Sequence, residues 1–102
     1  MTINNLHLYT ESNIKMDNPA RLIRRLCKHW AHKLTVECSE ASGVTEGRVE
    51  FEKGLLLLTE HPDYLAVHLS AMSDEDLEIL KEVFIRHAER MVPDETLEFT
   101  WA

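Results

Sequence analysis

The chain has 102 residues, 44% of them apolar and 28% charged, a balance typical of one globular domain and unlike that of disordered proteins. Its net charge of −7 disfavours broad affinity for nucleic acid, and no apolar run reaches the length of a membrane span. Because the start of the chain lacks a signal-peptide pattern, the protein is expected in the cytoplasm, where its two cysteines stay reduced.

The first predicted element is a strand over residues 5–12. Apolar and polar side chains alternate there, with Leu6 and Leu8 on the inner side and His7 and Tyr9 on the outer side. This alternation predicts a strand with one face toward a core.

A helix is predicted next, because Asn18 is a favourable N-cap and Pro19 a favourable first helical residue. The apolar period continues to about His32 or Lys33. On a helical wheel, the residues of the apolar stripe, which we expect to face the core, are Leu22, Ile23, Leu26, Cys27 and Trp30.

Three later segments alternate in the same way, and the residues predicted to point inward are Leu34, Val36 and Cys38, then Val49 and Phe51, then Leu65, Val67 and Leu69. Cys38 is therefore expected to be an inert core thiol. Gly54 indicates a turn or a bulge. The run Leu55–Leu58 is either a separate strand or a continuation that is buried on both faces.

A second helix is predicted to begin after Ser73, with Asp76 in a capping-box-like position, and to end before Pro93. Alternation over residues 97–101 predicts a closing strand. The order β-α-β-β-(β)-β-α-β predicts a two-layer α+β domain, with an antiparallel sheet of about five or six strands and both helices on one face. The opposite face is expected to be polar and largely acidic, with His7, Tyr9, Thr35, Glu37, Glu50, Glu52, His68, Glu98 and Thr100.

The first helix is unusual because its segment, residues 18–33, carries five Lys or Arg residues and no Asp or Glu, whereas all 18 acidic residues lie elsewhere. Its basic residues from Arg21 to Lys28 share one face with His29 and His32. That face is either the solvated side of an amphipathic helix or a binding surface for an anion, with Arg25, His29 and His32 as its cradle.

The same segment contains a possible metal-binding pattern. Cys27, His29 and His32 read as Cys-x-His-x-x-His, but Cys27 lies on the opposite side of the helix from both histidines, so one ion cannot bind all three. His29 and His32 alone would need further ligands. His87 falls in the apolar stripe of the second helix and is expected to be a packed histidine with one hydrogen bond.

Residues 19–33 read Pro-x-Arg-Leu-x-x-x-Leu-Cys-Lys-His-Trp-x-His-Lys. This pattern resembles the signature of the bacterial domain-of-unknown-function family 2218, and the similarity extends to the apolar run after Gly54 and to the Leu-x-Phe-x-Trp ending. The family often has a Tyr shortly after the equivalent of Arg21, where this chain has Leu22 and Ile23. The resemblance implies a stand-alone bacterial cytosolic protein with no activity to carry over. The positions it singles out for testing are Arg21, Cys27, His29, His32 and Lys33.

The sequence supports two functional hypotheses. The first is a non-enzymatic binding or accessory domain that presents its basic helix face to an anionic small molecule or an acidic protein partner, through Arg21, Arg25, Lys28, His29, His32 and Lys33. The alternative is a metal- or iron-handling protein that uses His29 and His32. No catalytic residue, cofactor, nucleic-acid partner or membrane partner is expected, and the chain is expected to be a monomer or a homodimer.

Overall fold

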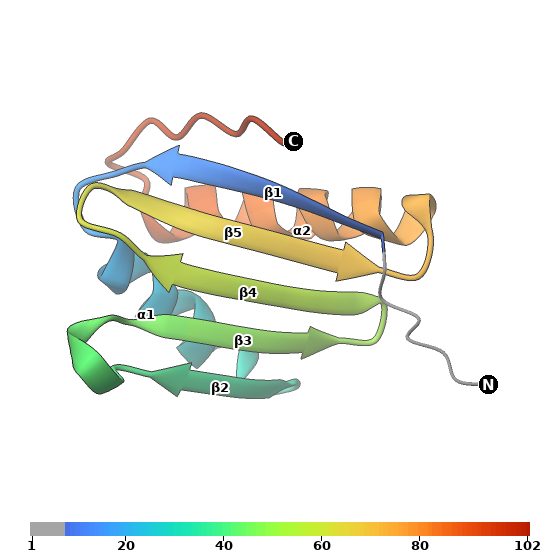
Figure 1. The fold of residues 1–102 in the computed structure, drawn as a ribbon, viewed down its shortest axis with the longest axis horizontal. Coiled ribbons are helices and arrows are strands. Elements are labelled where there is room, and N and C mark those ends of the chain that lie inside the picture. Colours follow the sequence, from blue (N-terminus) through green and yellow to red (C-terminus); the bar gives the residue numbers. More distant parts are fainter. Residues whose placement is uncertain (1–7) are drawn as a thin grey trace.

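Alternation between buried and exposed residues builds five strands, which pair antiparallel in the order β1-β5-β4-β3-β2. The computed structural model describes residues 8–102. Its elements in chain order are β1 (Leu8–Lys15), α1 (Pro19–Trp30), β2 (Thr35–Ser39), the 3-10 turn η1 (Ala41–Gly43), β3 (Glu46–Phe51), β4 (Gly54–Glu60), β5 (Tyr64–Ala71) and α2 (Asp74–Met91). Both helices cover the same face of the sheet, so the predicted two-layer α+β fold is confirmed (Figure 1).

The core lies between the sheet and the helices. β4 and β5 occupy the centre of the sheet and contribute Leu56, Leu58, Leu65 and Leu69, while α2 contributes Phe84, and all five are buried. The second helix begins as predicted, because the Ser73 side chain accepts a hydrogen bond from the backbone N–H of Asp76 at 3.1 Å.

The structure resolves the alternatives for the Leu55–Leu58 run. It belongs to β4, a strand of its own, in which Leu56 and Leu58 are buried under the helices and Leu55 and Leu57 are half-buried on the other face. Gly54 is the first residue of this strand. A Cβ at this position would lie 2.1 Å from the backbone oxygen of Ser70. Close approach of two strands therefore requires glycine at this position.

The predicted closing strand over residues 97–101 is wrong. This segment forms no strand; it runs beside β1 and is tied to it by Ala102 N–H donating to Glu11 O at 2.9 Å and by the Thr10 hydroxyl donating to Ala102 O at 2.7 Å (Figure 1). The apolar side chains of Leu97, Phe99 and Trp101 still pack against the core. Alternation predicted their packing correctly but not a hydrogen-bonded ladder.

The prediction of a core Cys38 is also wrong, since this residue is exposed. It sits on β2, the edge strand of the sheet that residues 8–102 form, where no further strand of that range shields it. Glu52 is misplaced as well: it lies in the turn between β3 and β4 and does not share a strand face with Glu50.

The remaining differences are shifts of element ends. The first strand extends to Lys15, three residues beyond its predicted end, while the predictions for Leu6 and His7 lie outside the described residues. The first helix ends at Trp30, so His32 and Lys33 fall in the turn that follows it. Within residues 8–102, neither helix combines the length and apolarity needed to cross a bilayer.

Candidate functional site

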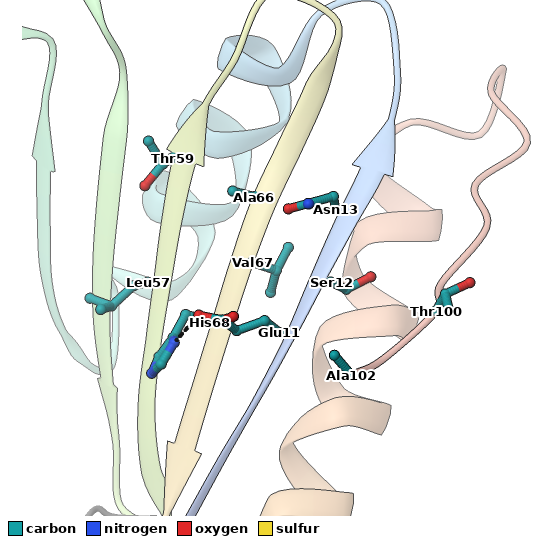
Figure 2. A pocket seen from close by; sticks show the side chains of 10 residues that line it. All are labelled: Glu11, Ser12, Asn13, Leu57, Thr59, Ala66, Val67, His68, Thr100 and Ala102. Atoms are coloured by element: carbon teal, nitrogen blue, oxygen red, sulfur yellow. Dashed lines mark hydrogen bonds and ion pairs between the residues drawn. The ribbon is translucent and has the colours of Figure 1, made fainter.

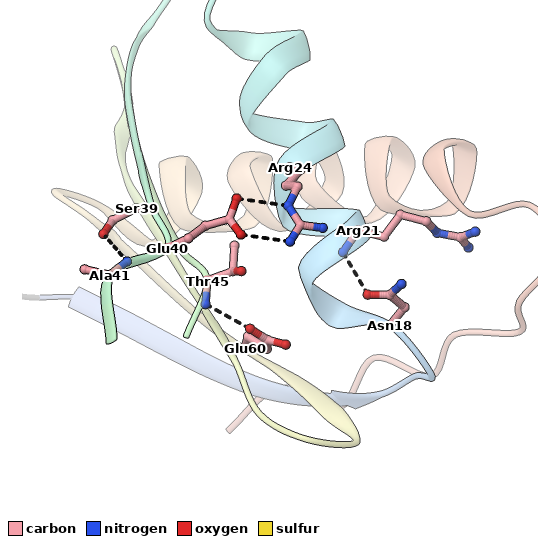
Figure 3. Close-up of polar contacts among 8 residues, drawn as sticks. All are labelled: Asn18, Arg21, Arg24, Ser39, Glu40, Ala41, Thr45 and Glu60. Atoms are coloured by element: carbon pink, nitrogen blue, oxygen red, sulfur yellow. Dashed lines mark hydrogen bonds and ion pairs between the residues drawn. The ribbon is translucent and has the colours of Figure 1, made fainter. Parts of the chain in front are cut away.

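The basic side chains of α1 point away from the sheet because its apolar residues occupy the opposite side. The helix begins where the Asn18 side chain accepts a hydrogen bond from Arg21 N–H at 3.1 Å, with Pro19 in the first turn (Figure 3). Trp30 is buried, whereas Lys28 and His29 are exposed. The wheel therefore predicted the orientation of this helix correctly.

Arg21 is held by the segment that follows α2. Its Nη2 lies 3.6 Å from Asp94 Oδ1 and 3.9 Å from Glu95 Oε2, and Glu95 also accepts a hydrogen bond from the backbone N–H of Asp17 at 3.3 Å. Arg21 thus anchors the C-terminal segment to the start of α1.

Arg24 and Arg25 also have partners within the chain. Arg24 donates two hydrogen bonds to the Glu40 carboxylate, at 3.0 Å from Nε and 2.8 Å from Nη2, and this bidentate pairing lowers the pKa of Glu40 below its ordinary value (Figure 3). Arg25 Nη1 donates to the backbone oxygen of Met91 at 2.6 Å, which satisfies a carbonyl at the end of α2. Both arginines join α1 to neighbouring segments.

The remaining predicted site residues form what we call the cationic end of α1, namely Lys28, His29, His32 and Lys33. All four are exposed, and none forms an ion pair with another residue of the described range 8–102. The turn that carries His32 and Lys33 is fixed by the backbone N–H groups of Lys33 and Leu34, which both donate to Trp30 O, at 3.0 and 2.9 Å.

Helix α2 adds a residue that the sequence did not place at the site. The ring centroid of His87 lies 5.0 Å from that of His29 and 5.0 Å from that of Trp30. His87 Nδ1 lies 2.7 Å from Val83 O, and because a carbonyl oxygen only accepts, Nδ1 is the donor of this hydrogen bond. One hydrogen bond and partial burial match the expectation for His87, but its contact with His29 depends on how the helices pair.

The geometry limits what metal this site could hold. Cys27 is 4% exposed and faces the sheet, while His29 faces solvent, so these two side chains cannot share an ion. In the described part of the chain, no group of three or more His, Cys, Asp or Glu side chains is placed to bind a metal. The pair of His29 and His87 offers two imidazoles, and solvent or a ligand would have to complete the coordination.

The open face of the sheet carries a separate polar cluster. His68 Nδ1 lies 3.1 Å from Glu11 Oε2, and the His68 ring stacks on Tyr9 with centroids 5.2 Å apart. Figure 2 shows Glu11 and His68 turned toward each other across β1 and β5. They line an open hollow of about 560 Å³ together with Leu57 and Thr59. Sequence alone missed the pair because the two residues are neighbours only through the β1–β5 register.

The chain is similar to a known protein family and to a solved structure. A family model described as "Uncharacterized protein conserved in bacteria (DUF2218)" matches residues 11–102. The NMR structure of PA4090 from Pseudomonas aeruginosa is similar, with a TM-score of 0.76 and 30% sequence identity over 93% of this chain and 95% of the Pseudomonas chain. No curated protein matches the chain.

Proposed function

The chain belongs to the uncharacterised bacterial family DUF2218, and we propose that it is a non-enzymatic binding domain whose cationic end of α1 recognises an anionic group on a small molecule or an acidic partner. The observation that carries the proposal is that Lys28, His29, His32 and Lys33 are exposed without an ion-pair partner among residues 8–102, while Arg21 and Arg24 are already paired.

Electrostatics support this assignment. Two lysines and two histidines fall within residues 28–33 at one end of a helix, whereas the whole chain has a net charge of −7 with histidine counted as neutral, so this surface attracts anions locally against an unfavourable overall field. Arg25 lies next to the cationic end of α1. Only its Nη1 donates to Met91 O, so its other N–H groups can donate to a ligand. Basic residues at this end also interact favourably with the helix dipole, and the experiment must separate that role from binding.

The test uses inorganic pyrophosphate as the probe and the tryptophan fluorescence of the chain, which comes from Trp30 and Trp101, as the signal. Trp30 is suited to this purpose because its ring lies 6.3 Å from that of His29 and 5.0 Å from that of His87. We expect saturable binding that weakens with added salt. The double variant Lys28→Gln/Lys33→Gln should weaken this binding about tenfold, because it removes two exposed positive charges that would pair with the pyrophosphate.

The matched control is Lys15→Gln/Lys53→Gln, which removes the same charge from β1 and from the turn before β4. This control should bind pyrophosphate as the wild type does. Equal weakening by both double variants would mean that overall charge alone attracts the probe, and the proposal would fail. Absence of saturable binding to pyrophosphate and to a poly-glutamate peptide would refute it outright.

A second candidate function is transition-metal binding at His29, with His87 in place of the predicted partner His32. The specific observation is the 5.0 Å separation of the two ring centroids, because two imidazoles on one Zn²⁺, at about 2.0–2.1 Å from nitrogen to metal, have ring centres roughly 5 Å apart. Calorimetric titration with Zn²⁺ should give one site per chain that His87→Gln removes and His61→Gln leaves intact. Zinc stoichiometry near zero would eliminate this candidate.

A further inference from the structure

The two cysteines lie on different elements that meet at Gly47. Cys27 is buried on the sheet side of α1, and Cys38 is exposed on β2. Cys38 pairs directly with Gly47 of β3. A Cβ on Gly47 would lie only 2.8 Å from Cys27 Sγ, so the sulfur of Cys27 occupies the space that a side chain at position 47 would otherwise fill.

This arrangement brings the two thiols together. Directly opposed residues of antiparallel strands point to the same face, with Cβ positions about 4.5–5.5 Å apart, so the side chain of Cys38 projects beside the sulfur of Cys27. The electrostatics agree with the geometry: burial, together with smaller contributions from the neighbouring Cys38, raises the pKa of Cys27 to about 12. Cys27 is therefore protonated at neutral pH, and Cys38 is the thiol that a dissolved oxidant reaches first.

We propose that Cys27 and Cys38 form a reversible disulfide that fastens the edge strand β2 to α1 when the protein is exposed to hydrogen peroxide. The Cys38 thiolate attacks one peroxide oxygen, the O–O bond breaks, and a Cys38 sulfenic acid and hydroxide result. The Cys27 sulfur then attacks the Cys38 sulfur, the S–O bond breaks, and the proton of Cys27 leaves with the departing hydroxide as water. Two electrons pass from the sulfurs to the peroxide, and a small dithiol reverses the change.

The bridge would act where the sheet is least protected. β2 is a five-residue strand at the edge of the sheet, with no neighbour on its outer side among residues 8–102, and four of its residues are exposed. Such an edge is available for pairing with other strands. A covalent link to α1 would hold it in the native register, and this consequence is independent of anion or metal binding at the opposite side of α1.

The experiment treats the reduced full-length protein with hydrogen peroxide at neutral pH, blocks free thiols and digests with trypsin. The expected product is a peptide covering residues 26–28 linked to one covering residues 34–48, with intact chains lighter by two hydrogen atoms and fully restored by dithiothreitol. The oxidised chain should show a Tm higher by roughly 10 °C, because the bridge closes a loop of moderate length. A lower Tm would contradict bridging within the native fold.

Two single variants keep the test decisive. Cys27→Ala should leave Cys38 as a sulfenic acid that dimedone traps, whereas Cys38→Ser should leave Cys27 as an unreacted thiol because that residue is buried. Because Cys38 is a surface residue, its variant remains folded even if the core variant does not. Recovery of wild-type Cys27 as a free thiol, with Cys38 overoxidised or linked to a second chain, would overturn the proposal.

Discussion

The two sides of α1 differ in what decides their role. On the sheet side, Leu22, Ile23 and Leu26 are all 0% exposed, as expected for a stripe with a helical period. On the solvent side, chemically similar cations have unlike fates: Arg24 forms an ion pair with Glu40, whereas Lys28 forms none with any residue of the described range.

This difference shows that burial and availability are separate questions. A periodic apolar stripe determines which side of a helix packs. Whether an exposed cation is free for a ligand depends on which distant acids or carbonyls the fold brings to it, such as Met91 O for Arg25, at 2.6 Å. A basic face in a sequence is thus a set of candidates, and the tertiary structure selects among them.

The largest effect should come from the sheet side. Leu26→Ala removes a side chain that is 0% exposed and should lower the free energy of unfolding by about 2–5 kcal/mol, through lost burial and the cavity left behind. Chemical denaturation measures this change. Lys28→Ala, two residues further along α1 on its solvent side, is the control and should change stability by less than about 0.5 kcal/mol. Similar losses in both variants would contradict the division between the two sides.

The next prediction concerns the buried thiol of Cys27 and its effect on stability in alkaline solution. Burial raises the pKa of this thiol from 9.0 to about 12 in the folded chain, so the unfolded chain releases the proton first and stability falls as pH rises. This contribution is complete below about pH 9 and is lost toward about pH 12. Cys27→Ala should flatten the decline in the free energy of unfolding, measured with a reductant present. Parallel curves for the variant and the wild type would disprove this assignment.

A smaller loss is expected at Gly47, where side chains of α1 lie against the backbone of β3. A Cβ at Gly47 would lie 2.8 Å from Cys27 Sγ and 3.2 Å from Ile23 Cγ2. Gly47→Ala should therefore cost about 1–3 kcal/mol of unfolding free energy, as overpacking does. In a double-mutant cycle, Cys27→Ala should recover part of that loss because it removes the obstructing sulfur. Strict additivity of the two changes would show that α1 tolerates the extra methyl group without strain.

The smallest effects should come from the solvent side. Arg25→Gln removes a hydrogen bond to the end of α2 and should cost about 1 kcal/mol. Arg24→Gln breaks a pair that is open to water, and thermal unfolding at moderate salt should not resolve any change. A larger loss of unfolding free energy for Arg24→Gln than for Arg25→Gln would show that the exposed ion pair of Arg24 stabilises the fold more than expected for a pair open to water.

Local patterns predicted most of the fold for an identifiable reason. Helix starts depend on residues close in sequence, as at Asn18 and Ser73, and strand faces depend on alternation with period two. The prediction of a closing strand over residues 97–101 was wrong because alternation also fits an extended segment that packs on the core without pairing as a strand. Phe99 contacts the core, but few of its neighbours form hydrogen bonds with β1. The prediction that Cys38 is buried was wrong because alternation indicates which side of a sheet a residue faces, but not whether its strand lies at the edge of the sheet.

The sequence by itself determined the two-layer α+β class, the apolar stripe of α1 and the outward direction of its cations. Only the tertiary structure decided that His29 meets His87, that Cys38 lies beside Cys27 through Gly47, and that His68 binds Glu11. The reason is physical: hydrophobic periodicity is a property of neighbouring residues, whereas these pairs join residues from different elements, and their contact exists only once strand order, register and helix packing are set.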